Sequence, residues 1–145
     1  MAFLIKDELN TVCQIALIDK MTNADDSIVS TIIEESISTM KGYMSRYYDA
    51  EIIFNQQGND RHKATLKRLK DIVIYEIYER QTREQNAVAA RRYNEAMNWL
   101  EKLNTGENGD HTLPSVPADA PENTGTTGGT GDTRFGGNKK YTSTY

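Results

Sequence analysis

The sequence predicts an all-α fold, a small bundle of three main helices plus a short N-terminal helix, followed by a long extended C-terminal arm. Apolar residues up to about residue 105 recur mostly at steps of three or four, which places them on one face of a helix. No segment makes a convincing strand with a partner strand. From Gly106 onward the chain holds eight of its ten glycines and all three prolines, a composition that lacks the apolar surface needed to fold alone.

The short first helix is predicted from Lys6 to about Leu17. Asp7 and Glu8 stand near its start, where acidic residues favour a helix N-terminus. A polar break with capping residues, 22–26, follows. The apolar positions of the predicted first helix are Leu9, Val12, Cys13, Ile15, Ala16 and Leu17.

The second helix is predicted from about Asp25 to Met44. Its core stripe consists of Ile28, Ile32, Ile33, Ile37, Met40 and Met44. Glu34 and Glu35 fall off this stripe. A connector, 49–59, comes next, and we expect Ile52, Ile53 and Phe54 to hold it onto the body.

The third and fourth helices are predicted from about Arg61 to Gln81 and from about Ala87 to Leu103. Asn59 or Asp60 is a plausible cap for the third helix, and Gly106 fits a C-terminal stop for the fourth. The stripes consist of Leu66, Leu69, Ile72, Val73 and Ile77 in the third helix and Ala89, Tyr93, Ala96, Leu100 and Leu103 in the fourth. A short polar joint, 82–86, separates the two helices.

Residue types that carry catalysis are sparse and poorly spaced. His62 and His111 lie in no metal-binding pattern, so we expect no zinc and a solvated His62 at a helix start. Cys13 sits in an apolar segment, which favours a small buried filler over a nucleophile. The sequence therefore predicts no enzyme, no cofactor and no metal site.

The charge balance limits the partners. The net charge is −4, and both the body and the arm are mildly acidic. A net acidic body argues against tight binding of duplex DNA, which usually needs a basic face. No stretch approaches the ~20 apolar residues of a membrane span, so we expect no membrane partner.

Basic residues gather on the last two predicted helices. They are Lys63, Lys67, Arg68 and Lys70 on the third helix and Arg91 and Arg92 on the fourth. A solvated helix face explains them, but a sharper interpretation is pairing between subunits, with this surface meeting the glutamates of a neighbour. Trp99 shares the stripe of the last helix, which favours the core, although tryptophan is also enriched at interfaces. The candidate subunit-interface residues are therefore Glu34, Glu35, Lys63, Lys67, Arg68, Arg91 and Trp99.

Four segments together resemble a small protein family of Mu-like phages and prophages. They are the opening 3–9 (FLIKDEL), 42–47 (GYMSRY), 69–75 (LKDIVIY) and 92–102 (RYNEAMNWLEK), the last closing at Gly106. The order and spacing of these segments are more specific than any one of them, and the resemblance covers most of residues 3–106.

Members of this family resemble the head–tail connector (adaptor) proteins of tailed phages. The resemblance implies a non-enzymatic helical subunit in the virion neck that is assembled in the host cytoplasm. Such subunits form a homo-oligomeric ring, usually dodecameric, which docks under the portal protein and contacts a further neck or tail protein. DNA would pass through the ring's channel without sequence-specific binding.

The arm then divides into two parts beyond the helical body, 1–105. A Gly/Thr/Pro-rich linker, 106–133, is not part of the family's core pattern, and its 28 residues would span roughly 30 Å. The resemblance implies that the end of the arm, 134–145, anchors the subunit to the portal, either by side chains in pockets or as an added strand. The predicted anchor residues are Arg134, Phe135, Lys139, Lys140, Tyr141 and Tyr145.

Two alternatives remain open. The chain could form the next ring down, a stopper or tail-completion protein. It could instead be a small helical regulatory adaptor that binds a soluble partner or nucleic acid through its basic cluster, with the arm as a passive linker. A salt-dependent affinity for DNA would favour the regulatory adaptor.

Overall fold

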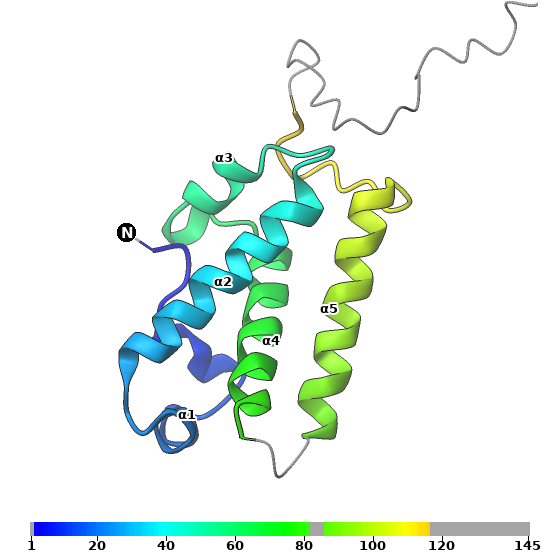
Figure 1. The fold of residues 1–145 in the computed structure, drawn as a ribbon. Helices are drawn as coiled ribbons and strands as arrows, with labels where there is room; N and C mark the ends of the chain where they lie inside the picture. Colours follow the sequence, from blue (N-terminus) through cyan, green and yellow to red (C-terminus); the bar gives the residue numbers. More distant parts are fainter. Residues whose placement is uncertain (1, 82–85, 117–145) are drawn as a thin grey trace, which may run out of the picture.

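The computed structural model describes residues 2–81 and 86–116, and these residues confirm the all-α prediction. Their elements, in chain order, are the 3₁₀ helix η1 (Lys6–Thr11), α1 (Ile15–Thr22), α2 (Asp26–Met44), α3 (Ala50–Asn55), the 3₁₀ helix η2 (Gly58–Asp60), α4 (Lys63–Glu79) and α5 (Ala87–Thr105) (Figure 1). Within the described ranges no strand forms; the one β-bridge is isolated.

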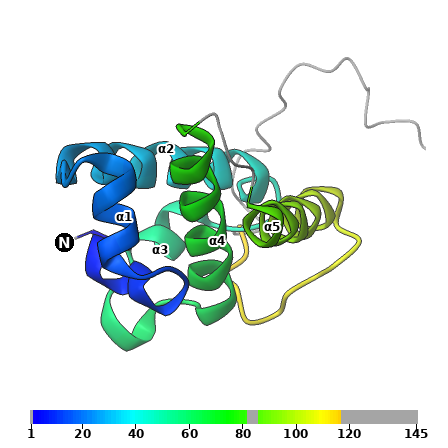
Figure 2. The same cartoon turned by 90° about the horizontal axis from the view of Figure 1, so that it is seen from below.

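Helix α4 lies at the centre of the bundle. It packs between α2 and α5 and also contacts α1 (Figures 1 and 2). Its buried positions lie on several sides of the helix because neighbours surround it: Thr65, Leu69, Asp71, Ile72, Val73, Ile74 and Ile77. The core is completed by fully buried side chains from the packed helices, among them Met40 of α2 and Leu100 of α5.

The predicted first helix, Lys6 to Leu17, is in fact two elements. The N–H groups of Val12 and Cys13 both donate to the Leu9 carbonyl, and Gln14 then takes an extended conformation with ψ 134° before α1 begins. This break turns the chain so that Leu9 and Ile18, on either side of it, are both fully buried. The sequence did not predict this break, because the apolar periodicity continues across it without interruption.

Side-chain caps set most helix starts. Asp25 accepts the Ser27 N–H at the start of α2, and Asn86 accepts the N–H groups of Val88 and Ala89 at the start of α5. Helix α4 differs from the prediction, since its cap is His62 rather than Asn59 or Asp60. Gly106 ends α5 with a φ of 75°, as the stop signal predicted.

The predicted connector, 49–59, contains the short helix α3, which is capped by Asp49. Ile53 and Phe54 are buried as expected, and Phe54 packs edge to face on Phe3 with ring centroids 5.0 Å apart. Ile52 was predicted to join them, but it is 53% exposed. A helical turn over these residues directs adjacent side chains about 100° apart, so one of the three must face outward.

The first residues after α5 fold back onto the body instead of starting a free linker. We define 107–116 as the C-terminal strap. Leu113 of the strap is buried, the Asp49 N–H donates to the Pro114 carbonyl at 2.8 Å, and the Val116 N–H donates to the Tyr47 carbonyl at 3.1 Å. One apolar anchor and these main-chain bonds hold a segment whose composition alone indicated an extended chain.

Candidate functional site

A groove lined by basic residues runs between η1, α4 and α5. Its volume is about 540 Å³, and we call it the basic groove. It is lined by Thr11, Val12, Lys63, Leu66, Lys67, Lys70, Asp71, Arg91, Arg92 and Glu95. Three of the predicted interface residues, Lys63, Lys67 and Arg91, are therefore brought together here.

Arg68 does not line the basic groove. Its guanidinium lies 3.9 Å from the Glu95 carboxylate, and Arg91 lies 4.0 Å from the same residue. The Lys70 ammonium donates to the Thr11 hydroxyl at 3.1 Å, which ties η1 to α4. The groove thus has an internal framework of polar contacts.

Asp71 is a buried carboxylate in the wall of the basic groove. Only 4% of the residue is exposed, and none of its contacts within residues 2–81 and 86–116 is a hydrogen bond or an ion pair. Burial raises the pKa of Asp71, although the nearby charges of Arg92, Arg68 and Lys67 act in the opposite direction. The sequence does not mark this residue as functional, because a single Asp among basic residues resembles ordinary surface charge. The apolar run Ile72, Val73 and Ile74 beside it is the one signal of its burial.

A second cavity of about 140 Å³ adjoins the groove between α4 and α5, and Asp71 and Arg92 line both. Cys13 also lines it, with its Sγ 3.9 Å from the Tyr78 hydroxyl. Cys13 is buried, as predicted for a small filler, and burial raises the pKa of its thiol, which disfavours a thiolate nucleophile.

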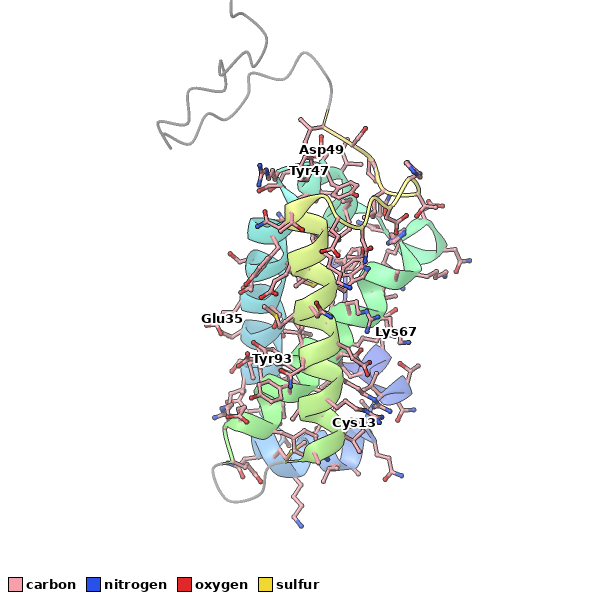
Figure 3. All side chains as sticks on the ribbon, turned by 90° about the vertical axis from the view of Figure 1, so that its right-hand side faces the viewer. Cys13, Glu35, Tyr47, Asp49, Lys67 and Tyr93 are labelled. Atoms are coloured by element: carbon pink, nitrogen blue, oxygen red, sulfur yellow. The ribbon has the colours of Figure 1, made fainter. Side chains whose placement is uncertain are left out.

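An acidic surface lies on the opposite side of the bundle. Figure 3 shows Glu35 and Tyr93 on one side of the molecule and Lys67 on the other. Glu76 and Glu79 lie three residues apart on α4, so they share one side of that helix, and Glu35 lies on α2, which packs against α4. Desolvation, then the charges of Glu79 and Glu35, raise the pKa of Glu76. We call Glu35, Glu76 and Glu79 the acidic ridge.

Aromatic rings accompany the acidic ridge. Tyr75 of α4 stacks on Tyr93 of α5 with ring centroids 4.0 Å apart and planes 20° apart. Glu34 is exposed but lies about 100° around α2 from Glu35, so it is not part of the ridge. Trp99 is half-buried against the core, in agreement with its place on the α5 stripe.

The strap is held by a histidine that was predicted to be solvated. His62 Nε2 lies 2.7 Å from the Thr112 hydroxyl and 3.4 Å from the Asp110 carboxylate, while Nδ1 accepts the Thr65 N–H at 3.2 Å. Its side chain is only 14% exposed, and each ring nitrogen faces a polar partner. The residue thus caps α4 and latches the strap at the same time.

Asp110 is the acidic half of this latch. Its partial burial acts to raise its pKa, but hydrogen bonds from the Thr112 hydroxyl and N–H, together with His62 and His111, hold the pKa of Asp110 below its usual value. The Tyr48 hydroxyl accepts the Asp110 N–H at 2.9 Å. The carboxylate is therefore held in its charged form against the body.

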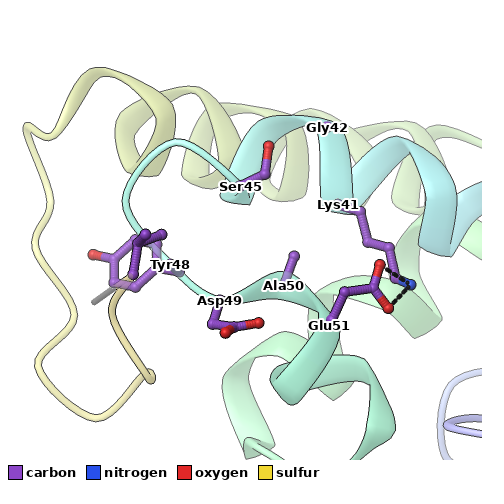
Figure 4. Close-up of a pocket in the computed structure, with 8 residues that line it drawn as sticks. Lys41, Gly42, Ser45, Tyr48, Asp49, Ala50 and Glu51 are labelled. Atoms are coloured by element: carbon purple, nitrogen blue, oxygen red, sulfur yellow. Dashed lines mark hydrogen bonds and ion pairs between the residues drawn. The ribbon is translucent and has the colours of Figure 1, made fainter. Parts of the chain in front are cut away.

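The strap ends beside an open pocket at the junction of α2 and α3. The pocket has a volume of about 410 Å³ and is lined by Lys41, Gly42, Ser45, Tyr48, Asp49, Ala50, Glu51 and Val116 (Figure 4). The Lys41 ammonium lies 2.9 Å from the Glu51 carboxylate across it. Val116 is the last described residue, so the chain leaves the described body at this end.

Several predictions concern metals, membranes and the arm. Within 2–81 and 86–116, no group of three or more His, Cys, Asp or Glu side chains is placed to hold a metal ion. Among the helices that the structure describes, none is both long and apolar enough to cross a membrane. The predicted anchor residues lie outside the described residues: Arg134, Phe135, Lys139, Lys140, Tyr141 and Tyr145.

Comparison with known proteins identifies the family. Residues 4–128 match the family described as Bacteriophage Mu, Gp36. No curated protein and no solved structure gives a match. The match covers most of the chain and includes all four segments on which the resemblance rested except Phe3. It also runs through the strap to residue 128, so the prediction that the linker, 106–133, lies outside the family's pattern is wrong for most of that segment. The chain therefore belongs to the Bacteriophage Mu Gp36 family, as the resemblance to small proteins of Mu-like phages predicted.

Proposed function

We propose that this chain is a structural subunit of the phage neck, a head–tail connector that forms a ring under the portal and extends the DNA channel towards the tail. The observation that carries the proposal is the family match over residues 4–128, which makes the chain a phage protein. The segment resemblance to connector proteins supplies the finer role. In this proposal the chain is not an enzyme, and its partners are copies of itself, the portal protein and a further neck or tail protein.

The shape and charge of the body support a ring. A closed ring of identical subunits uses two different surfaces on each copy, one meeting the other on the next copy. The basic groove and the acidic ridge lie on opposite sides of a single small bundle (Figure 3). The body thus offers two complementary faces in an arrangement that a head-to-tail ring requires.

The arm would attach the ring to the portal. The strap fixes the chain to the α2–α3 end of the body as far as Val116, so the arm begins from a defined point. The remaining linker, 117–133, would then provide reach, and residues 134–145 would bind the portal by aromatic side chains and by lysine and arginine charges.

Deletion of residues 134–145 tests this role. We expect the truncated protein to lose attachment to the portal in a pull-down assay while its helical circular dichroism and melting temperature stay unchanged. A matched control replaces 125–131 by a Gly/Ser sequence of equal length, which we expect to retain attachment because it preserves reach. Normal tail joining by the truncated protein would refute the anchoring role.

Two alternatives make different predictions. A stopper or tail-completion ring would bind a connector ring but not the portal itself, so the same pull-down separates it from the proposed role. The basic groove favours the second alternative, a helical adaptor that binds nucleic acid. That function requires a DNA affinity that falls steeply with salt, whereas we expect no binding at moderate salt because the net charge of the chain is −4.

A further inference from the structure

The basic groove has more positive charge than its own carboxylates neutralise. Of its five cationic side chains, only Arg91 comes within 4.0 Å of a carboxylate among the described residues. The other four are Lys63, Lys67, Lys70 and Arg92. On a chain with a net charge of −4, so concentrated a basic surface indicates a specific acidic partner rather than general solubility.

Asp71 gives the groove a second property. Asp71 is 4% exposed and has no hydrogen-bond or ion-pair partner in the described chain, and burial of its carboxylate raises its pKa. Such a group is left ready to accept a hydrogen bond from whatever enters the groove. The phosphodiester group of a nucleic acid has no hydrogen-bond donor for this carboxylate, whereas a protein partner can offer hydroxyl or N–H donors.

The acidic ridge is an independent feature with the complementary properties. Glu35, Glu76 and Glu79 form no ion pair within the described chain, and their mutual repulsion contributes to the raised pKa of Glu76. Beside them, the half-buried Tyr93 offers a phenolic donor. A cationic partner would therefore relieve the repulsion, and the phenol could serve an acceptor such as a buried carboxylate.

We propose that the basic groove of one copy receives the acidic ridge of the next copy, so that successive subunits join head to tail through these two surfaces. The inference rests on the proposed ring but narrows it to defined residues. It also leaves three predicted interface residues outside the contact: Arg68, which does not line the groove, Glu34, which lies off the ridge, and Trp99, which packs against the core.

Two charge-reversed variants test the contact in the full-length chain. The groove variant carries Lys67→Glu and Arg91→Glu, and the ridge variant carries Glu35→Lys and Glu76→Lys. We expect the wild-type chain to self-associate in native mass spectrometry and sedimentation velocity. We expect each variant to associate at least ~10-fold more weakly, because like charges that face each other cost several kcal/mol.

Mixing the variants gives the sharpest result. The intact ridge of the groove variant fits the intact groove of the ridge variant, and the two reversed surfaces fit each other. An equimolar mixture should therefore form assemblies in which the two variants alternate, although neither variant assembles alone. A chain with all four substitutions should regain self-association, which also shows that the substitutions leave the fold intact. Glu34→Lys and Lys20→Glu are matched controls at exposed positions outside both surfaces and should associate like the wild type.

The inference would be overturned by wild-type association of either variant alone, by the absence of mixed assemblies from the mixture, or by no self-association of the wild-type chain up to about 1 mM. A groove-dependent affinity for DNA from a monomeric wild-type chain would overturn it in favour of a nucleic-acid site. Portal attachment is measured separately through the arm. Loss of attachment alone would refute the connector role, and loss of the head-to-tail contact alone would refute only this inference.

Discussion

Helix α4 and the C-terminal strap are held in place by different forces. Seven residues of α4 are buried among α1, α2 and α5, whereas Leu113 is the one buried residue among 107–116. The strap depends instead on a few point contacts, chiefly with His62 and with the main chain at Tyr47 and Asp49. The difference indicates that packing sets the stability of the body, while the position from which the arm starts is set by contacts that could open without unfolding it.

The largest effect should come from the core. Leu100→Ala removes a fully buried side chain of α5 and should lower the free energy of unfolding by about 2–5 kcal/mol, since the cavity cannot close completely. Urea denaturation measures the loss. Val88→Ala on the same helix, at a side chain that is 48% exposed, is the control and should change stability by less than about 0.5 kcal/mol.

A smaller effect is expected in the strap. Leu113→Ala should lower the free energy of unfolding by about 1–2 kcal/mol, because a strap that detaches limits the loss to its own docking free energy. Hydrogen exchange should become fast at Val116 and Asp49, whose N–H groups bond across this contact, but not in α4. A loss as large as that of Leu100→Ala would show that the strap belongs to the core.

The contact of His62 with Thr112 and Asp110 of the strap should contribute still less to stability. His62→Ala removes the α4 cap and the contact to Thr112, and should destabilise the protein by about 1 kcal/mol while speeding exchange in the strap. The exposed His111 provides the comparison, because it acts on Asp110 only through its charge, so His111→Ala should change both stability and exchange much less than His62→Ala does. Equal hydrogen exchange in the strap of the two variants would show that His62 does not hold the strap on the body.

The smallest effect concerns pH and has the opposite sign. The folded-state pKa of Asp71 is raised above the ordinary 3.8. Ionisation of this carboxyl therefore destabilises the folded state at neutral pH. The loss of stability disappears as the pH falls through the raised pKa towards 3.8. Asp71→Asn should therefore be more stable than the wild type at neutral pH, with a gain that shrinks on acidification. Urea titrations across this range measure it; a neutral-pH loss of stability would mean that the carboxylate has a stabilising partner.

The sequence predicted the three long helices well because each has a stripe that persists over several turns. It could not predict the break at Gln14 or the six-residue α3, since both are too short or too local to show periodicity. The strap was missed because Leu113 is a lone apolar residue beside Pro114, and a single contact leaves no pattern in the sequence.

The candidate surfaces were partly predictable for a similar reason. Lys63 and Lys67 lie one turn apart on a single helix, so sequence spacing alone brings them together. The acidic ridge depends on how α2 packs against α4, which brings Glu35 near Glu76 although they lie far apart in the chain. The role of Asp71 likewise requires knowledge of which side of α4 faces α5.

The most direct measurement of the central claim is electron microscopy of particles from a phage whose copy of this gene carries an early stop codon. The connector role predicts DNA-filled heads without tails, together with free complete tails, and restoration of joined virions when the chain is supplied in trans. Normal joined virions, or heads that fail to form, would contradict a role at the junction between head and tail.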